Sequence, residues 1–314
     1  MINKKYILIF IIIGLVIQLS YAQKDMYMFT SFHEPADEGL RYIYSKDGVK
    51  WDSIPGTWLK PEIGNEKVMR DPSMVRSPDG VYHLVWTTSW KGDLGFGYAN
   101  SKDLIHWSEE KMIPVMKNEP TTVNVWAPEI FYDDDKAEFV VVWASCVPHR
   151  FEKGLEDELN NHRLYYITTK DFHTISETKL LYDPGFSTID ATIIKRAKND
   201  YVMVLKDNTR PNRNLKVAFS KSPTGPYSKP SNSFTESFVE GPTVQKIGKK
   251  YLIYFDEYRK FTYGAVETKD FKHFKNISNN VCIPKGHKHG TIFKASTSDI
   301  TNLIHKSEIA QKDK

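Results

Sequence analysis

The chain has 314 residues, of which 40% are hydrophobic and 13% aromatic, a composition that supports one sizeable globular core. Its formal net charge of +4 comes from 43 basic and 39 acidic residues. A charge so close to balance argues against nucleic acid or an anionic membrane surface as the partner.

Residues 1–22 have the pattern of a secretory signal peptide. Two lysines precede the apolar run Tyr6–Leu19, and Ala22 ends a small-residue cleavage pattern, so we expect the mature chain to begin at Gln23. A single membrane anchor is the alternative, but the run is short for a span and no basic flank follows it. We therefore expect export to the periplasm or the extracellular space, without stable membrane insertion after cleavage.

Val68–Ser89 is predicted to form a β-hairpin. Alternating apolar residues flank the turn Ser77-Pro78-Asp79-Gly80, in which Pro fixes φ and Gly permits a tight reversal. The same plan of apolar strand, polar turn and apolar strand recurs at Ala127–Ser145, Asp190–Asp207 and Glu240–Glu257.

A second repeated element, Ser or Thr followed by Lys, comes after each hairpin, at Ser101, Thr169, Ser220 and Thr268. A fifth copy at Ser45 has no hairpin before it, and its missing strand is found at the other end of the chain, at His289–Ser296. We therefore predict an all-β fold, a closed five-bladed β-propeller with four antiparallel strands per blade and a fifth blade completed by strands from both termini. A β-sandwich with chance similarity between turns is the alternative, but the fixed order of the repeats favours the propeller.

We take residues 23–302 as one propeller domain and residues 303–314 as a polar, frayed C-terminal tail. The longest departure from the repeat, Cys146–His162, is expected to form a loop on one rim, where it either shapes a binding pocket or is a solvated insertion. Cys146 and Cys282 could pair in an exported protein, but a closed propeller needs no covalent staple, so unpaired thiols are expected.

The start of each inner strand holds the residues of chemical interest. Aligning the inner strands places one residue of each just before the apolar run, namely Asp71, Ala127, Asp190, Glu240 and His289. Because the inner strands of a propeller surround its axis, these side chains are predicted to converge at one mouth of the central channel. Carboxyl groups brought together there are costly unless they are hydrated, protonated or used in chemistry. Capping of the hairpins would explain one such acid, but three in equivalent positions favour an active site.

The segments around these positions resemble those of glycoside hydrolase family 43. They are Arg70-Asp71-Pro72-Ser73, Trp126-Ala127-Pro128-Glu129, Ile189-Asp190-Ala191-Thr192, Glu240-Gly241-Pro242-Thr243 and Gly286-His287-Lys288-His289-Gly290-Thr291. The resemblance covers nearly the whole mature chain and implies an inverting hydrolase. By that resemblance Asp71 is the general base, Glu240 the general acid, and Asp190 the residue that orients the acid and tunes its pKa.

These residue types suit hydrolysis with inversion. One carboxylate activates water on one face of the anomeric carbon, while one protonated carboxyl delivers a proton to the departing oxygen on the other face. Asp71 and Glu240 come from separate blades, which leaves room for that water. An ionised Asp190 nearby is expected to raise the pKa of Glu240 towards the working range.

Further side chains are candidates for holding a sugar. Trp126 and Trp86 are candidate platforms for the apolar face of the ring, and Glu129 or Asn124 are candidates for hydrogen bonds to its hydroxyls. An aromatic residue in a propeller is more often part of the core. Trp126 is favoured over Trp86 because it stands beside the mouth of blade two.

Arg70 and Lys206 are expected either to pair with the carboxylates or to form surface salt bridges. His289 is expected to join a polar network in the channel, and a hydrated calcium ion beside it is the alternative. No cysteine pair has metal-ligand spacing, and no cofactor is expected to be required.

The resemblance implies cleavage of terminal glycosidic bonds in plant-type polysaccharides or oligosaccharides, most readily by an α-L-arabinofuranosidase-like activity. A β-xylosidase, a galactosidase or a galactofuranosidase of the same fold stays open. The alternative from another class is a carbohydrate-binding propeller without catalysis, and the presence of all three acids argues against it.

Overall fold

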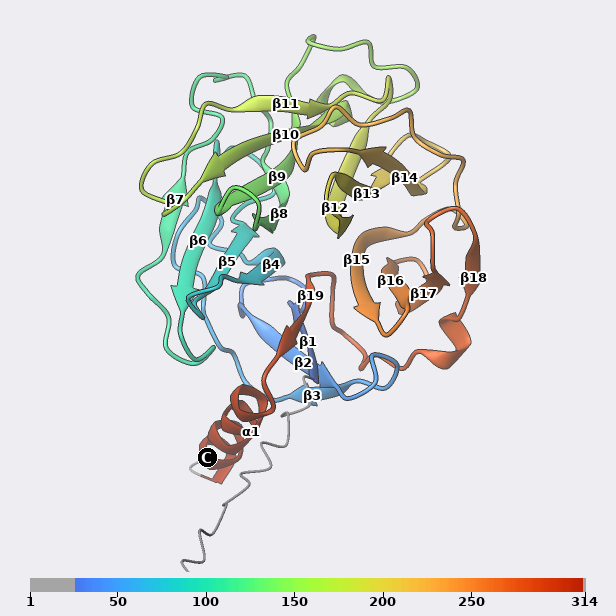
Figure 1. Cartoon of the computed structure of the whole chain (residues 1–314). Coiled ribbons are helices and arrows are strands. Elements are labelled where there is room, and N and C mark those ends of the chain that lie inside the picture. Colours follow the sequence, from blue (N-terminus) through green and yellow to red (C-terminus); the bar gives the residue numbers. More distant parts are fainter. Residues whose placement is uncertain (1–25, 313–314) are drawn as a thin grey trace, which may run out of the picture.

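The computed structural model of the protein describes residues 26–312 and shows a closed ring of five β-sheets around a common axis (Figure 1). Each sheet is one blade with antiparallel strands, so the prediction of a five-bladed propeller is confirmed. The expected signal peptide lies outside the described residues. Within residues 26–312, no helix combines the length and the apolar character needed to cross a membrane.

The blades follow one another along the chain. Blade one contains β4 (Arg70–Arg76), β5 (Tyr82–Thr87), β6 (Phe96–Ser101) and β7 (Lys111–Ile113). Blade two contains β8 (Trp126–Asp133), β9 (Glu138–Cys146), β10 (His162–Thr169) and β11 (Lys179–Tyr182). Blade three contains β12 (Thr188–Ala197), β13 (Asp200–Asp207) and β14 (Asn214–Ser220). Blade four contains β15 (Glu240–Ile247), β16 (Lys250–Glu257), β17 (Thr262–Thr268) and β18 (Phe274–Asn276).

Blade five joins the two ends of the chain. It contains β19 (Ile292–Ala295), β1 (Met26–Ser31), β2 (Arg41–Ser45) and β3 (Asp52–Ile54), in that order from the axis outwards. Strand β1 pairs antiparallel with β19, with Met26 opposite Ala295 and Phe29 opposite Ile292. The prediction that strands from both termini complete the fifth blade is confirmed. Two short 3-10 turns, η1 (Glu158–Asn160) and η2 (Ser278–Asn280), and the helix α1 (Thr297–Lys312) complete the regular structure of the described residues.

Blade three has three strands instead of the expected four. The segment outside β14 contains Pro223, Pro226 and Pro230, whose fixed φ and missing backbone N–H groups do not suit a regular strand. The segment still follows β14, because the backbone N–H groups of Ser231 and Phe234 donate to carbonyl groups of that strand. The prediction of four strands in every blade is therefore wrong for blade three.

The repeated Ser/Thr-Lys element is a turn at the end of the third strand of a blade. In blade one the Ser101 hydroxyl accepts the N–H of Leu104 at 2.9 Å, and the Asp103 carboxylate accepts the N–H groups of Ile105 and His106. Equivalent carboxylates accept two N–H groups each at Asp47, Asp171 and Asp270. The element recurs because the chain must turn in the same way towards the outer strand of each blade.

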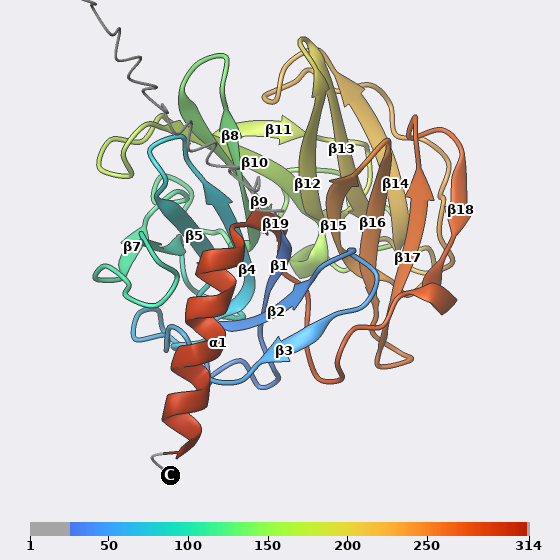
Figure 2. The same ribbon diagram turned by 60° about the horizontal axis from the view of Figure 1, so that its bottom comes forward.

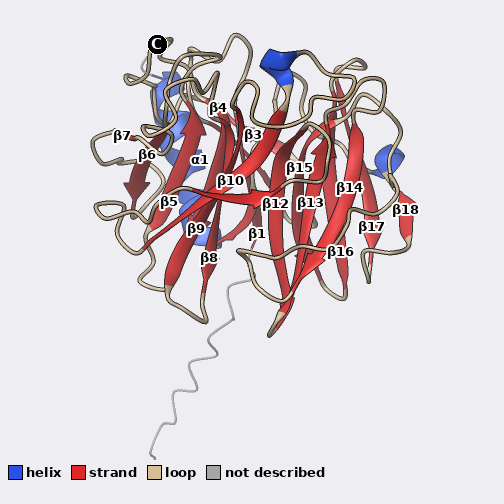
Figure 3. Ribbon diagram, turned by 90° about the horizontal axis from the view of Figure 1, so that it is seen from above, coloured by secondary structure: helices blue, strands red, loops and turns tan. Residues whose placement is uncertain are grey.

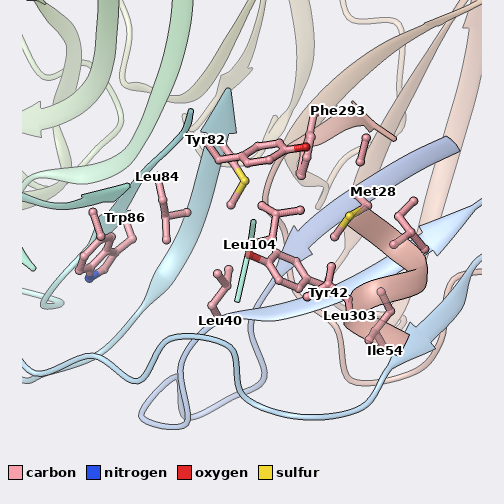
Figure 4. Packing of buried hydrophobic residues seen from close by; sticks show 14 of the residues in the cluster. Met28, Leu40, Tyr42, Ile54, Tyr82, Leu84, Trp86, Leu104, Phe293 and Leu303 are labelled. Atoms are coloured by element: carbon pink, nitrogen blue, oxygen red, sulfur yellow. The ribbon is translucent and has the colours of Figure 1, made fainter. Parts of the chain in front are cut away.

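The core lies between neighbouring blades. Figure 4 shows the cluster in which blade five packs against blade one, with Met28 and Tyr42 on one side and Tyr82 and Leu84 on the other. Similar apolar clusters fill the remaining spaces between the blades. Because interiors pack closely, these clusters fix the angle at which each blade presents its inner strand to the axis.

The C-terminal residues form α1, which lies against blades five and one (Figure 2). Ile300 and Leu303 are fully buried and lie three residues apart, on one face of the helix. Ser296 caps the helix by accepting the N–H of Asp299 at 3.1 Å. The expectation of a frayed tail over residues 303–314 is wrong as far as residue 312, because two apolar residues at helical spacing anchor an otherwise polar segment.

Both cysteines are free, as expected. Cys146 is buried, and its thiol donates to the carbonyl oxygen of Glu158 at 3.2 Å. Cys282 is exposed.

Seen from the side, the strands cross the thickness of the ring and the loops collect at its two faces (Figure 3). The inner strands are β4, β8, β12, β15 and β19, and each contacts its neighbours around the axis. Their first residues therefore meet at one end of the channel, which we call the mouth.

Candidate active site

The inner strands of blades one to four each begin with a β-bulge. The bulged residue has a positive φ, which is 53° at Asp71, 46° at Ala127, 53° at Asp190 and 55° at Gly241. Three of these residues are not glycine, and such backbone conformations tend to occur at functional sites. The bulge lets two successive residues of one strand line the mouth, as Arg70 and Asp71 do.

Glu240 occupies the first of these two positions. It shares that position with Arg70, Trp126 and Ile189, all of which directly precede the bulged residue. The sequence alignment that made Glu240 equivalent to Asp71 is therefore wrong by one residue. It matched acid with acid, whereas the residue equivalent to Asp71 in blade four is Gly241.

The mouth forms a pocket lined by all three predicted catalytic residues, Asp71, Asp190 and Glu240. Three other candidates line it as well: Arg70, Trp126 and His289. Sequence analysis assigns no role to the remaining lining residues, which are Phe32, Glu34, Thr87, Trp90, Ile189, Asp256 and Lys288.

Asp71 is held as an ionised carboxylate. Its Oδ1 contacts Nε2 of His289, and its Oδ2 accepts the Thr87 hydroxyl at 2.9 Å. Thr87 in turn accepts the backbone N–H of Ala127 at 2.8 Å, which directs its own hydrogen towards Asp71. Burial alone would raise the pKa of Asp71, but the His289 imidazolium and Arg70 outweigh burial and lower it. A carboxylate so fixed can accept a proton from a water molecule in the pocket.

His289 carries a positive charge at the centre of the site. Burial would lower its pKa, but the neighbouring Asp71, Asp190 and Glu240 carboxyl groups raise it to about 9. The ring lies against Gly241, where a Cβ atom would come within 1.7 Å of Nδ1. Glycine at position 241 therefore makes room for the histidine.

The residues around His289 do not fit a hydrated calcium ion. Calcium takes several oxygen ligands, and Nε2 of His289 is already occupied by Oδ1 of Asp71. Lower in the channel, the Glu129 carboxylate already accepts three hydroxyl groups, those of Ser73, Thr192 and Thr291. In residues 26–312 the acids that approach one another closely enough to hold an ion are Asp133, Asp134 and Asp135, in the β8–β9 turn, where Lys195 pairs with two of them.

Asp190 is a buried carboxyl between blades three and four. Its Oδ2 accepts the backbone N–H of Gly241 at 3.2 Å. This hydrogen bond links Asp190 to the backbone directly after Glu240. Burial raises the pKa of Asp190, although His289 and Lys206 oppose that rise.

Glu240 is paired with a buried lysine. Its Oε2 lies 2.9 Å from Nζ of Lys206. Burial alone would raise the pKa of Glu240, but Lys206 and His289 outweigh burial and hold it below its usual value. Burial raises the pKa of the neighbouring Asp190. The expectation that Asp190 raises the pKa of Glu240 stays a prediction.

Two indoles form one wall of the pocket. Trp126 stacks on His162 at 4.8 Å and packs against Trp90 at 4.6 Å, and its N–H donates to the carbonyl oxygen of Trp90 at 2.9 Å. These contacts occupy much of the ring of Trp126. Trp90 is 49% exposed and has ring surface left for a ligand. Sequence analysis missed Trp90 because it lies in the β5–β6 loop, outside every repeat.

Trp86 is a core residue, so its prediction as a sugar platform is wrong. It is fully buried between blades five and one, and it does not line the pocket. It pairs across the sheet with Gly97, where a Cβ atom would come within 2.1 Å of the indole. The glycine lets the indole lie flat on the neighbouring strand.

Asn124 also lies outside the pocket, contrary to the prediction. It is buried, with Oδ1 3.1 Å from Nε2 of His162, the ring on which Trp126 stacks. Asn124 therefore supports the aromatic wall from behind.

Glu129 lies below the pocket, in the channel, so it does not face a sugar at the mouth as predicted. Its oxygens accept the hydroxyls of Ser73 at 2.6 Å and Thr192 at 2.7 Å. Burial raises its pKa. Glu129 thus forms a polar layer with Ser73, Thr192 and Thr291 beneath the predicted catalytic groups.

Arg70 is in the pocket, and its guanidinium pairs with both oxygens of Glu34 at 2.9 and 3.0 Å. It also lies between two aromatic rings, 5.0 Å from the centre of Phe32 and 5.2 Å from the centre of Trp90. Arg70 therefore holds the aromatic wall in place and pairs with a carboxylate other than the catalytic ones.

Hydrolysis of a glycosidic bond needs carboxyl groups in different protonation states around one sugar. The mouth of this propeller brings three carboxyl groups into one pocket, and the class that fold and site define together is the glycoside hydrolases. Residues 22–300 match the family described as a probable glycosyl hydrolase domain, related to glycoside hydrolase family 43, and the chain belongs to that family.

The sequence is 26% identical to an α-L-arabinofuranosidase of Bifidobacterium longum over 148 residues, which cover 40% of this chain and 14% of that protein. The match thus spans a small part of a much longer relative. Among solved structures, a thermostable family-43 glycoside hydrolase has a TM-score of 0.54 at 16% identity, covering 70% of this chain and 78% of that chain. An α-L-arabinofuranosidase from Lactobacillus brevis has a TM-score of 0.53 at 17% identity, covering 67% and 72%. These two structures share the fold.

Proposed function

We propose that the protein hydrolyses terminal α-L-arabinofuranosyl bonds in plant-type polysaccharides or oligosaccharides, with inversion at the anomeric carbon. The observation that carries the proposal is that Asp71 and Glu240 reach one pocket from blades one and four. A sugar between them has one carboxyl on each side, as hydrolysis of a glycosidic bond requires, and the relation to glycoside hydrolase family 43 favours inversion.

Asp71 acts as the base. The His289 imidazolium and the Thr87 hydroxyl hold its carboxylate ionised and in one orientation. It takes a proton from a water molecule as the water oxygen bonds to the anomeric carbon.

Glu240 acts as the acid. One-third of its side chain is exposed to the pocket, so it can reach a departing oxygen. Catalysis uses the protonated form of Glu240, whose Oε–H bond breaks as the proton moves to that oxygen. The departing oxygen also keeps the electron pair of the broken glycosidic bond. Asp190 orients the acid through the N–H of Gly241.

The walls of the pocket support a single terminal sugar as the substrate. Trp90 and Trp126 bound one side, and the ion pair of Lys288 with Asp256, at 2.9 Å, bounds another. An α-L-arabinofuranoside is favoured because the relatives above bear that activity in their names. We also propose that the enzyme acts in the periplasm or outside the cell, since residues 1–22 have the pattern of a signal peptide.

The test is a panel of 4-nitrophenyl glycosides carrying α-L-arabinofuranose, β-D-xylose, β-D-galactose or β-D-galactofuranose. We expect the arabinofuranoside to be cleaved fastest, and proton NMR of the first sugar released to show the inverted anomer. If another glycoside of the panel is cleaved fastest, its sugar replaces arabinofuranose as the proposed substrate. Release of the anomer with retained configuration would refute the inverting mechanism. Binding of sugars without cleavage of any member would identify a carbohydrate-binding propeller.

A further inference from the structure

Lys206 is the cation closest to Glu240. It lies on β13 in blade three, opposite Ile189 in the ladder, and its side chain is 3% exposed. Its Nζ crosses to blade four and lies 2.9 Å from Oε2 of Glu240 (Figure 1 shows these blades side by side). Within residues 26–312, Glu240 is the one carboxylate within ion-pair distance of Lys206.

We propose that Lys206 is a positioning residue for the acid: it holds Oε2 of Glu240 and leaves Oε1 to face the departing oxygen. The inference rests on the proposed function. Oε1 has no hydrogen-bond partner among the described residues, whereas Oε2 is fixed by Lys206. A flexible glutamate at the mouth thus has one defined orientation.

The contact also favours the transition state. As the proton leaves Oε1, Glu240 becomes a carboxylate, and an ammonium attracts a carboxylate more strongly than it attracts a neutral carboxylic acid. The interaction is therefore stronger in the transition state than in the ground state, which is the condition for catalysis. A departing sugar alkoxide, which needs the proton most, gains most from this contact.

Lys206 acts within a set of charged groups around Glu240. The titratable groups that face it from the packed elements are Arg70 and Asp71 of β4, Asp190 of β12, Asp256 of β16, Tyr263 of β17 and His289 before β19. Lys206 and His289 lower the pKa of Glu240, so removal of Lys206 raises that pKa. Glu240 then stays protonated to higher pH, so the basic limb of the plot of kcat/KM against pH moves to higher pH.

The experiment compares Lys206→Met, Lys206→Arg and the matched control Lys216→Met. Lys216 lies on the next strand of the same blade and pairs with Asp207 at 3.8 Å, outside the pocket. In Lys206→Met we expect the basic limb of kcat/KM to move up by roughly 1–3 pH units, the range that an adjacent opposite charge produces. We also expect a larger loss of kcat on an arabino-oligosaccharide than on the nitrophenyl glycoside. Lys206→Arg is expected to restore much of the profile, and Lys216→Met to match the wild type.

Loss of activity with an unchanged pH profile, or the same loss on both substrates, would show that Lys206 is merely structural and would overturn the proposal. If Lys206→Met does not fold by circular dichroism, Lys206→Gln is measured in the same way. If the wild-type protein cleaves no glycoside, the proposed function is refuted, but the contact between Lys206 and Glu240 is still open to test. In that case carbon-13 titration of Glu240 still tests the contact, because its pKa must rise in Lys206→Met, and an unchanged pKa would refute it.

Discussion

Oδ2 of Asp190 accepts the backbone N–H of Gly241 at 3.2 Å, and Gly241 directly follows Glu240, the proposed acid. An asparagine at position 190 keeps an oxygen that can accept this N–H, whereas alanine leaves the donor buried and unpaired. We therefore expect Asp190→Ala to lower kcat more than Asp190→Asn, with KM changed less than kcat in both. Steady-state kinetics on the nitrophenyl arabinofuranoside measures this, and equal losses would remove the orienting role.

The pairing of His289 with Asp71 sets the acidic limb of the rate profile. The imidazolium lowers the pKa of Asp71, so His289→Gln is expected to raise that pKa and to move the acidic limb of kcat/KM to higher pH. The control is His106→Gln, an exposed histidine in the turn after β6. An acidic limb that stays in place would show that another group limits activity at low pH.

The acid and the base can be separated by the leaving group. A sugar alcohol leaves poorly without a proton, whereas nitrophenolate is stable. Glu240→Ala is therefore expected to lower turnover of an arabino-oligosaccharide by roughly 10²–10⁴-fold, the range of general acid catalysis, and to spare much of the rate on the nitrophenyl glycoside. Asp71→Ala should lower both rates alike, since both substrates need activated water. The assignment of the acid fails if Glu240→Ala affects both substrates equally.

Trp90, and not Trp126, is expected to contact the sugar ring. Trp90→Ala should raise KM roughly 2–10-fold, as expected from the 0.5–1.5 kcal/mol that aromatic packing contributes, with Trp90→Phe closer to the wild type. Quenching of tryptophan fluorescence by the product sugar should be lost in the same variant. Leu180→Ala, at an exposed apolar residue of β11, is the control. An unchanged KM in Trp90→Ala would show that the ring faces solvent in the complex.

The helix α1 is expected to stabilise the ring through Leu303. Leu303→Ala removes a fully buried side chain between blades five and one and should lower the free energy of unfolding by about 2–5 kcal/mol. Urea unfolding measures it, with Ile309→Ala, a 42% exposed residue of the same helix, as the control. A loss no larger than that of the control would mean that the helix packs too loosely to hold the blades.

The blades could be predicted from the sequence because the same order of hairpin and turn recurs along the chain. The turn in which the Asp103 carboxylate accepts two N–H groups is formed by adjacent residues, and equivalent aspartates mark the copies at Asp47, Asp171 and Asp270. The irregular outer edge of blade three has no repeat to reveal it. The helix α1 was not predicted because its buried face contains few apolar residues, Ile300 and Leu303.

The candidate site could be predicted as a set of acids but not as an electrostatic arrangement. Asp71, Asp190 and Glu240 do line one pocket. The protonation of Glu240 depends on Lys206, which is distant in the sequence and becomes its neighbour only when blades three and four pack together. Trp90 likewise reaches the pocket through the shape of a loop, which no periodicity encodes.

The closure of blade five also completes the candidate site. His289 lies in the last part of the chain, just before β19, and β19 must pair with β1 from the opposite end. Asp71, the proposed base, thus meets His289 only after the ring has closed. A chain that lacks its last residues therefore has the carboxyl groups of blades one, three and four but not the histidine that lies among them.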